Sequence, residues 1–311
     1  MIINFKQILL LSILIAIVSS HSHFVATDYL NTFAKKLKEC RLKSFEIVEV
    51  YRKTDVSCFT QGLIFDRKEV TLEDGSTEEQ GVLIEACGNI GTSRVQQLQL
   101  SKNKEEYAPA KVLQYTTDKD GTALVQLDDL FYLSMTKRQR LFLKIDRTTL
   151  ELTNTIPYPS GLTISQGIAK TDTTLYITDG THQLFMLDIT TYEYLGYIYL
   201  KDELGRYLYK LSELEIVLDP LSSTYFLWAT QFASNHILKI DLQTGQVVKR
   251  YDLSLLDEIR KLSFAKESMP AWDSIVANQY DVVNGIAYDA VEGVFYVTGR
   301  RWHVIFKLQI Y

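Results

Sequence analysis

Three apolar segments of the chain each carry a side-chain amide directly before a glycine. The pairs are Gln61-Gly62 in FTQGLIF, Gln166-Gly167 in SQGIAK and Asn284-Gly285 in NGIAYD. An amide donates and accepts hydrogen bonds without titrating, so amides brought together would hold a polar ligand. A fourth apolar segment, ELEIV, supplies Glu213. We expect each segment to contribute one polar group to one common site.

The sequence offers no set of residues with the spacing of metal ligands. Its five histidines are scattered, and no two form a spaced pair on one expected strand. A calcium site would need several carboxylates and amides converging on one ion, but the inner segments supply Gln61, Gln166 and Asn284 without an aligned acidic ring. We therefore expect no metal and no cofactor. A calcium-dependent lactonase is accordingly the least favoured enzyme class.

The elements that would position these side chains form a repeat. Three stretches share an aromatic-rich strand, a polar turn, a second strand ending in Asp, a Thr-containing turn and a third strand. Their landmarks are Asp146, Asp188 and Asp241, at a spacing typical of one propeller blade per repeat. Asp and Thr in these turns are expected to bond the local backbone, which is a structural role.

Two weaker copies flank these three, so five units are expected. The segment FEIVEVY, residues 45–51, would complete the last unit and close the ring, which hides edge strands. The pattern predicts an all-β, five-bladed β-propeller over residues 44–311. A short helix within an N-terminal extension (21–43) and a helical loop insertion within residues 257–280 are expected outside the blades. Inner strands line the channel, where glycine permits close approach.

The N-terminus has the layout of a secretory signal peptide. Lys6 precedes an apolar run from Ile8 to Val18, and small residues follow at Ser19 and Ser20. We expect cleavage after residue 20, with an uncleaved anchor as the rival. The mature protein would then be secreted or would reside in the lumen of the secretory pathway, without membrane attachment. A net charge of −5 and the lack of a long basic run argue against a nucleic-acid partner.

Three cysteines remain after that cleavage, namely Cys40, Cys58 and Cys87. An oxidising compartment permits one disulfide among them. Cys58 opens one expected strand and Cys87 ends the next, so an antiparallel hairpin would place them at the same end. Pairing of Cys58 with Cys87 is the first hypothesis, and Cys40 stays a rival partner.

The ordered motifs of the chain resemble those of the plant and bacterial glutaminyl-peptide cyclotransferase (glutaminyl cyclase) family, from Phe45 to the C-terminus. No single motif decides this; their order and spacing do. The matching segments are Phe59–Leu63 (Phe-Thr-Gln-Gly-Leu), Glu85 with Gly88, Thr178–Gly180, Ser212–Glu215, Asn284–Asp289 (Asn-Gly-Ile-Ala-Tyr-Asp) and Thr298–Trp302.

The resemblance implies a five-bladed propeller that cyclises the N-terminal glutamine of peptides. The α-amine attacks the side-chain γ-carboxamide, pyroglutamate forms and ammonia leaves. Such a reaction needs a pocket that folds the side chain onto the amine, a proton carrier and donors for the developing oxyanion. The family type needs no metal. The expected partners are peptide or protein N-termini bearing Gln, and a monomer is expected.

The chain departs from the family pattern at several reactive positions. The proton-carrying Glu of the family falls on Thr122, and the Phe two residues earlier falls on Asp120. A family Trp falls on Gln166, a second Trp on Phe232, an Asn on Ser212 and a Lys on Arg300, whereas Phe59 and Gln61 are kept. Threonine cannot carry a proton near neutral pH. Ser212 and Arg300 still offer hydrogen-bond donors.

Two functional hypotheses follow. The first is a secreted cyclotransferase in which another carboxylate carries the proton, with Asp120 as the candidate and Glu85 and Glu213 as reserves. The second is a catalytically weakened or inactive propeller that binds peptide N-termini or small amides, supported by Thr122, Gln166 and Ser212. The substrate-binding residues expected in both are Phe59, Gln61, Gln166 and Phe232.

Overall fold

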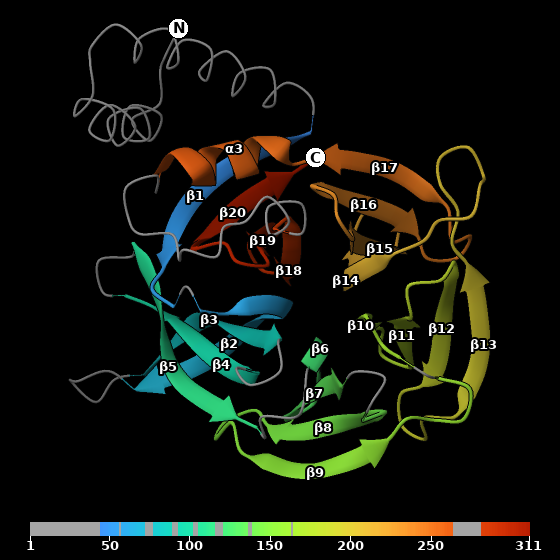
Figure 1. Ribbon diagram of the computed structural model, residues 1–311, viewed down its shortest axis with the longest axis horizontal. Helices are drawn as coiled ribbons and strands as arrows, with labels where there is room; N and C mark the ends of the chain where they lie inside the picture. The colour runs from blue at the N-terminus through green and yellow to red at the C-terminus, as the bar shows by residue number, and fades with distance from the viewer. Residues whose placement is uncertain are drawn as a thin grey trace, which may run out of the picture.

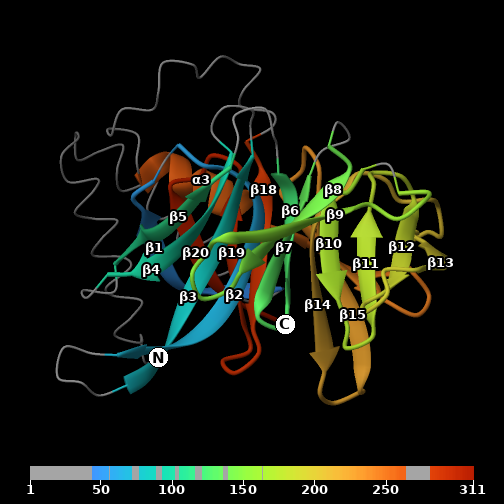
Figure 2. The same ribbon diagram turned by 90° about the horizontal axis from the view of Figure 1, so that it is seen from below.

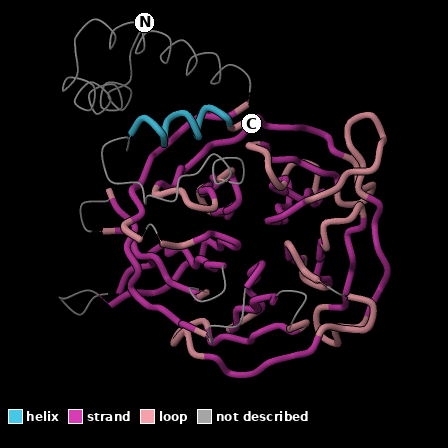
Figure 3. Tube along the Cα trace, viewed as in Figure 1, coloured by secondary structure: helices cyan, strands magenta, loops and turns pink. Residues whose placement is uncertain are grey.

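The computed structural model describes residues 44–55, 57–71, 77–88, 93–101, 105–115, 121–135, 139–162, 164–263 and 281–311. Several predicted features lie outside these ranges: the signal peptide, the N-terminal helical extension, Cys40, Asp120 and residues 264–280 of the expected helical loop. Within the described residues the fold is all-β with a single helix, α3 (Ser254–Ser263), so the prediction of an all-β chain is confirmed. Figure 3 shows how strands dominate.

Helix α3 opens the segment in which a helical insertion is expected. Its buried face carries Leu255, Leu256 and Ile259, which is the spacing of one helical face. On the exposed side Asp257 pairs with Lys261 one turn later, at 2.6 Å. No helix in the described part of the chain is long and apolar enough to cross a membrane.

Three antiparallel sheets of four strands follow one another in chain order. The β6 unit contains β6 (Gly121–Leu127), β7 (Leu130–Met135), β8 (Leu141–Asp146) and β9 (Leu152–Pro157). The β10 unit contains β10 (Gly167–Lys170), β11 (Thr174–Thr178), β12 (Gln183–Asp188) and β13 (Tyr194–Tyr199). The β14 unit contains β14 (Leu211–Asp219), β15 (Thr224–Gln231), β16 (His236–Asp241) and β17 (Val247–Asp252).

The fourth sheet has eight strands and consists of two four-stranded halves. The β2 unit contains β2 (Phe59–Thr71), β3 (Thr77–Gly88), β4 (Arg94–Leu100) and β5 (Glu106–Gln114). The β18 unit contains β18 (Val283–Asp289), β19 (Val294–Gly299), β20 (Val304–Ile310) and β1 (Phe45–Lys53). The halves join where β1 pairs with β5 in parallel, at only two residue pairs. The sequence predicts five separate sheets, whereas this short pairing merges two units into one sheet.

Strand β1 pairs with β20 in antiparallel register along its length, as expected for the segment FEIVEVY. The first described strand therefore completes a unit built from the end of the chain. Figure 1 shows the units arranged around a common centre, with β2, β6, β10, β14 and β18 innermost, and Figure 2 shows the same arrangement from the side.

The hydrophobic core lies between neighbouring units. Trp228 of β15, for example, packs on Phe295 of β19 with ring centroids 4.6 Å apart. At one end of the units, Asp146 Oδ1 accepts hydrogen bonds from the amides of Thr148 and Thr149 at 2.9 and 2.7 Å. Asp188 and Asp241 accept backbone bonds in the same way. These turns bond the local backbone, as the sequence predicts.

Candidate active site

Four of the five inner strands are interrupted by a β-bulge close to their first residue. Between β2 and β3 the register passes from Thr60 to Gly62 and leaves out Gln61. The same break leaves out Thr122 in β6 and Asn284 in β18, and in β14 it spans Ser212 and Glu213. A bulge re-aims the side chain of the extra residue and commonly lies beside a functional site. The bulges thus mark the polar residues that the sequence analysis selects.

In the β10 unit the corresponding residue is Gln166, directly before β10. Its backbone N–H donates to Thr178 O at 2.7 Å, although Thr178 already pairs with Gly167. All five inner strands therefore present one polar position at the same end. Asn284 is among the amides that the amide-glycine pattern selects for the common site, although the family resemblance assigns it no catalytic or binding role.

Glycines after the bulged residues allow the inner strands to approach closely. A Cβ added to Gly167 would lie 1.8 Å from Ser212 O, so the inner strands of the β10 and β14 units meet at this point. A Cβ on Gly62 would lie 3.0 Å from the backbone nitrogen of Leu124 in β6. At both positions a larger side chain would crowd the neighbouring inner strand, so glycine permits the close approach expected there.

Asn284 connects three units through hydrogen bonds. Its Nδ2 donates to Thr60 O at 2.8 Å and, over 3.5 Å, to Gln61 Oε1 in the β2 unit. Its Oδ1 accepts from Ser212 Oγ of the β14 unit at 2.8 Å. Asn284 is 1% exposed and Ser212 is 5% exposed. Because a buried polar group costs free energy unless it is bonded, this network fixes the orientation of both amides.

Arg300, in the turn after β19, lies between two aromatic rings. Its guanidinium carbon is 5.4 Å from the centroid of Phe59 and 4.6 Å from that of Phe232. Its carbonyl accepts from Thr60 N at 2.8 Å, which ties the turn to β2. Burial and, second, the like charge of Arg301 lower the pKa of Arg300 to about 10. Arg300 therefore stays cationic at neutral pH, and the rings hold its planar group in place.

The buried Nε atom of Arg300 has no hydrogen-bond partner among the described residues. A buried cationic donor without an acceptor is costly, so it is a suitable donor for an oxygen atom supplied by a ligand. The structure thus brings together six residues that the sequence analysis selects: Phe59, Gln61, Ser212, Phe232, Asn284 and Arg300.

Thr122 and Gln166 make their contacts elsewhere. Thr122 Oγ1 donates to Ser134 O at 3.1 Å, within its own unit. The side chain of Gln166 packs on Gly180, whose added Cβ would lie 2.8 Å from Gln166 Oε1. Both lie at the expected end of the inner strands, but neither has a side-chain contact with Arg300 or Asn284 among the described interactions. Asp120, one residue before β6, is outside the described residues.

Glu85 is occupied by a buried hydrogen-bond network. It accepts from Lys53 Nζ at 2.8 Å, Thr60 Oγ1 at 2.6 Å and Gln96 Nε2 at 2.8 Å. Lys53 and Glu85 are both fully buried. These three donors occupy the oxygens of the carboxylate within the protein interior. Glu85 therefore has a structural role and ties β1 to the β2 unit.

Glu213, the second bulged residue of β14, contacts a different unit. Its Oε2 accepts from Leu63 N of β2 at 2.9 Å. Its Oε1 is buried without a partner among the described residues, and the residue is 1% exposed. Burial raises the pKa of Glu213 well above its usual value. The two reserve carboxylates from the sequence therefore differ in their hydrogen-bond donors, with three side chains bonded to Glu85 and one backbone amide to the Glu213 carboxyl.

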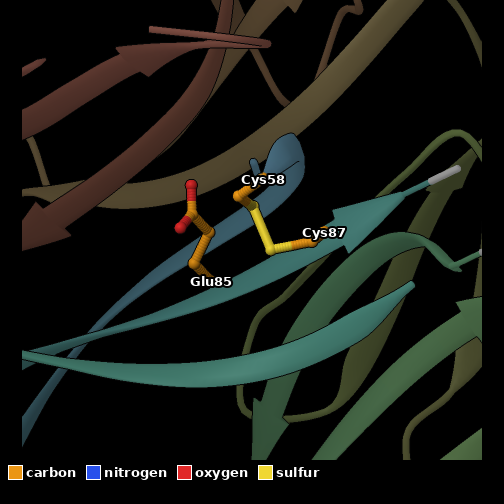
Figure 4. Close-up of side chains that lie close together, drawn as sticks. All are labelled: Cys58, Glu85 and Cys87. Atoms are coloured by element: carbon orange, nitrogen blue, oxygen red, sulfur yellow. A yellow bond between two sulfur atoms is a disulfide. The ribbon is translucent and has the colours of Figure 1, made fainter. Parts of the chain in front are cut away.

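Cys58 and Cys87 form a disulfide, with their Cα atoms 5.0 Å apart. Figure 4 shows the bond between β2 and β3 with the Glu85 side chain beside it. These three residues are the one group of metal-ligand type found among the described residues. Since both sulfurs are bonded to each other, they are not available as thiolate ligands. The disulfide holds the first residues of β2, where Phe59 and Gln61 lie.

Fold and site together define an all-β protein with a candidate ligand site at one end of its inner strands, built from amides, a hydroxyl and a buried arginine. The family model described as glutamine cyclotransferase matches residues 16–310. The chain therefore belongs to the glutamine cyclotransferase family, and this prediction is confirmed.

Two relatives agree with this assignment. A glutaminyl-peptide cyclotransferase of Arabidopsis thaliana is 23% identical over 273 residues, which cover 87% of this chain and 72% of the plant protein. The crystal structure of a Myxococcus xanthus glutaminyl cyclase is similar in fold, with a TM-score of 0.66 and 21% identity. That match covers 86% of this chain and 96% of the bacterial one.

Proposed function

We propose that the chain is a glutaminyl-peptide cyclotransferase that converts the N-terminal glutamine of peptides to pyroglutamate and ammonia. Family membership supports this function. The observation that carries it is the convergence of Gln61, Ser212 and Asn284 with the cationic Arg300 at one end of the inner strands. We also propose that the five four-stranded units are the blades of a propeller forming one domain, residues 44–311.

In this proposal the substrate side chain folds back so that its α-amine lies against its own γ-carbonyl carbon. A nitrogen–carbon bond forms, the bond to the amide nitrogen breaks, and one proton passes from the attacking amine to the leaving group, which departs as ammonia. Arg300 donates to the carbonyl oxygen as negative charge develops on it. Phe59 and Phe232 hold the guanidinium and cover the pocket wall.

The amides position the substrate amine. Asn284 Nδ2 is committed to Thr60 O and Gln61 Oε1, which leaves the NH₂ group of Gln61 to donate toward the ligand. Ser212 Oγ donates to Asn284 and keeps acceptor capacity for an ammonium or amine proton. Gln166 forms the wetter wall of the pocket where a family tryptophan stands.

In this proposal Asp120 carries the proton from the attacking amine to the leaving group, because Thr122 does not titrate near neutral pH. The test is direct. The purified protein is incubated with glutaminyl-alanine, and ammonia release is compared with the spontaneous rate in buffer. Turnover above buffer that is abolished by Asp120→Asn supports both the function and the carrier, and unchanged turnover in that variant removes Asp120.

A second candidate function is a catalytically weakened or inactive protein that binds peptide N-termini or small amides. The observation in its favour is that Thr122, which the resemblance places at the family's glutamate position, donates its hydroxyl to Ser134 O. A rate equal to buffer, together with calorimetric binding of the dipeptide, would favour this candidate.

We propose that residues 1–20 are a signal peptide and that the mature protein, a monomer preceded by the extension 21–43, is secreted or retained in the secretory lumen. Mass spectrometry of the protein recovered from a secreting host tests this. A mature N-terminus at His21 is expected, and an intact Met1 in the membrane fraction would contradict it.

A further inference from the structure

Tyrosine side chains are concentrated on one part of the surface. Of the fourteen exposed large hydrophobic residues in the described chain, seven lie between residues 194 and 209, and five of these are tyrosines. The last strands of the other two four-stranded sheets differ from β13 in composition. Strand β9 ends in Pro157, and β17 carries Lys249 and Arg250. Strand β13 reads YLGYIY and has no charge. A concentrated apolar surface of this kind commonly serves binding.

Five rings form a continuous row, which we call the tyrosine stripe: Tyr197, Tyr199, His182, Tyr207 and Tyr209. The His182 ring lies 4.3 Å from Tyr207, 5.2 Å from Tyr209 and 5.4 Å from Tyr199, centroid to centroid, and it is stacked on Tyr199. Tyr197 and Tyr199 are 5.0 Å apart. The four tyrosines of the stripe are each between 40% and 52% exposed, so their faces are available to a ligand.

The inner end of the stripe is continuous with the candidate active site. Lys210, next to Tyr209, donates its N–H to Gly180 O at 3.0 Å, and Gly180 packs on Gln166. Lys210 O in turn accepts from Phe232 N at 2.8 Å. Gln231, the neighbour of Phe232, also donates its side-chain amide to Tyr209 O at 3.2 Å. The stripe therefore begins near Gln166 and Phe232 of the candidate site and leads outward to the edge strand β13.

We propose that the tyrosine stripe binds the peptide residues that follow the N-terminal glutamine. This inference rests on the proposed function, because it places the peptide N-terminus beside Gln166, Phe232 and Arg300. Tyrosine rings present a rigid apolar face at low entropic cost, which suits uncharged segments with aromatic, aliphatic or prolyl side chains.

The length of the tyrosine stripe limits how many peptide residues it can contact. Steps of 5.2, 5.4 and 5.0 Å lead from Tyr209 through His182 and Tyr199 to Tyr197. The path is no longer than about 16 Å, which an extended peptide covers with about five residues at ~3.3 Å each. The substrate class is therefore an apolar peptide in which affinity increases up to about six residues and not beyond.

Binding is measured by calorimetry with probes that begin with Asn, because its α-amine cannot close a five-membered ring on the shorter side chain. The probes are Asn-Ala-amide, Asn-Ala-Pro-Phe-Tyr-Leu-amide and Asn-Ala-Gly-Ser-Gly-Ser-amide. We expect the apolar hexapeptide to bind at least tenfold more tightly than the other two. In the double variant Tyr207→Ala/Tyr209→Ala this advantage should disappear.

Tyr194→Ala is the matched control. Tyr194 is exposed on strand β13, which also carries Tyr197 and Tyr199 of the stripe, but it lies at the other end of that strand, opposite Leu187. It should leave the advantage unchanged. Three results would contradict peptide binding by the tyrosine stripe. They are equal affinities of the two hexapeptides, an affinity advantage that the double variant keeps, and no detectable binding of either hexapeptide at millimolar concentration. Self-association of the wild type that only the double variant loses would contradict it as well. These outcomes do not depend on ammonia release, which tests the proposed function separately.

Discussion

The candidate active site has two sides that differ in how their side chains are held. On one side, residues from the β2, β14 and β18 units contact one another across unit boundaries, through Asn284 and around Arg300. On the other side, Thr122 bonds to Ser134 in its own unit, and Gln166 packs on Gly180 in its own unit. The first side fixes groups that would hold an amide and an oxyanion. The second holds Thr122 and Gln166, which the sequence analysis expects at the family's proton-carrier and tryptophan positions.

This difference suggests that binding and proton transfer depend on separate parts of the site. If so, variants on the connected side should lower activity and stability, whereas a variant at Thr122 should be able to raise activity. The following changes test that separation, in order of decreasing expected effect.

Arg300→Met should lower kcat/KM for glutaminyl-alanine by about 10²–10³-fold, because it removes the charged donor to the developing oxyanion while keeping most of the side-chain volume. Arg300→Lys should lose less than tenfold, since it keeps the charge. Ammonia release gives both values, and thermal unfolding checks the fold. Equal activity of the Met variant and the wild type would exclude Arg300 from the reaction.

In the Asp120→Asn background, Thr122→Glu should raise kcat by about 10²-fold, because a positioned carboxylate restores the general acid–base catalysis that Asp120 is proposed to supply. The rate should then depend on an added ionisation in the pH profile. Thr122→Val is the control and should change the rate less than threefold. A Glu variant no faster than the Val variant would show that this side of the site is not limited by proton transfer.

Asn284→Leu should lower the free energy of unfolding by about 3 kcal/mol, because it leaves Thr60 O and Ser212 Oγ without their buried partner. Urea titration gives this value. Ser212→Ala removes one bond of the same network and should cost about 1 kcal/mol. If both variants unfold at the wild-type midpoint, the three units are not coupled through Asn284.

Glu213→Gln tests the protonated carboxyl. Burial raises the pKa of Glu213 in the folded protein, so its full contribution to stability is present only below pH 4.5, the usual pKa of the group. As the pH rises above this value, that contribution is lost, because the unfolded chain releases the proton first. From pH 5 to pH 7 the Gln variant should therefore gain stability relative to the wild type, by at most about 1.4 kcal/mol per pH unit. If the difference in free energy of unfolding between the two proteins is the same at pH 5 and pH 7, the pKa of Glu213 is not raised in the folded protein.

Much of the architecture is readable from the sequence because it depends on local patterns. Alternating strands, the Asp turns at Asp146, Asp188 and Asp241, and the repeated amide-glycine pairs all act over a few residues. The all-β fold, the β1–β20 pairing and the position of the polar residues at the inner strands follow from them. The merging of two units could not be predicted, because it depends on two residue pairs between β1 and β5.

The contacts within the site could not be predicted for a related reason. Ser212 and Asn284 are 72 residues apart, and only the completed arrangement of units decides that their side chains meet. The same applies to Arg300, whose two aromatic neighbours come from distant segments, and to Glu213, whose side chain accepts from Leu63 N of the β2 unit. Glu85 and Glu213 look equivalent in sequence, and only the folded structure shows that their carboxyl groups have different hydrogen-bond donors.

The antiparallel contact between β1 and β20 has a consequence for how the protein is made. During synthesis β1 emerges long before β20, so its polar edge stays unpaired until β20 has also been made. Asn284 and Arg300 lie in the same C-terminal unit as β20. The candidate site is consequently incomplete until this unit has been synthesised, and products terminated before it would not bind the ligand.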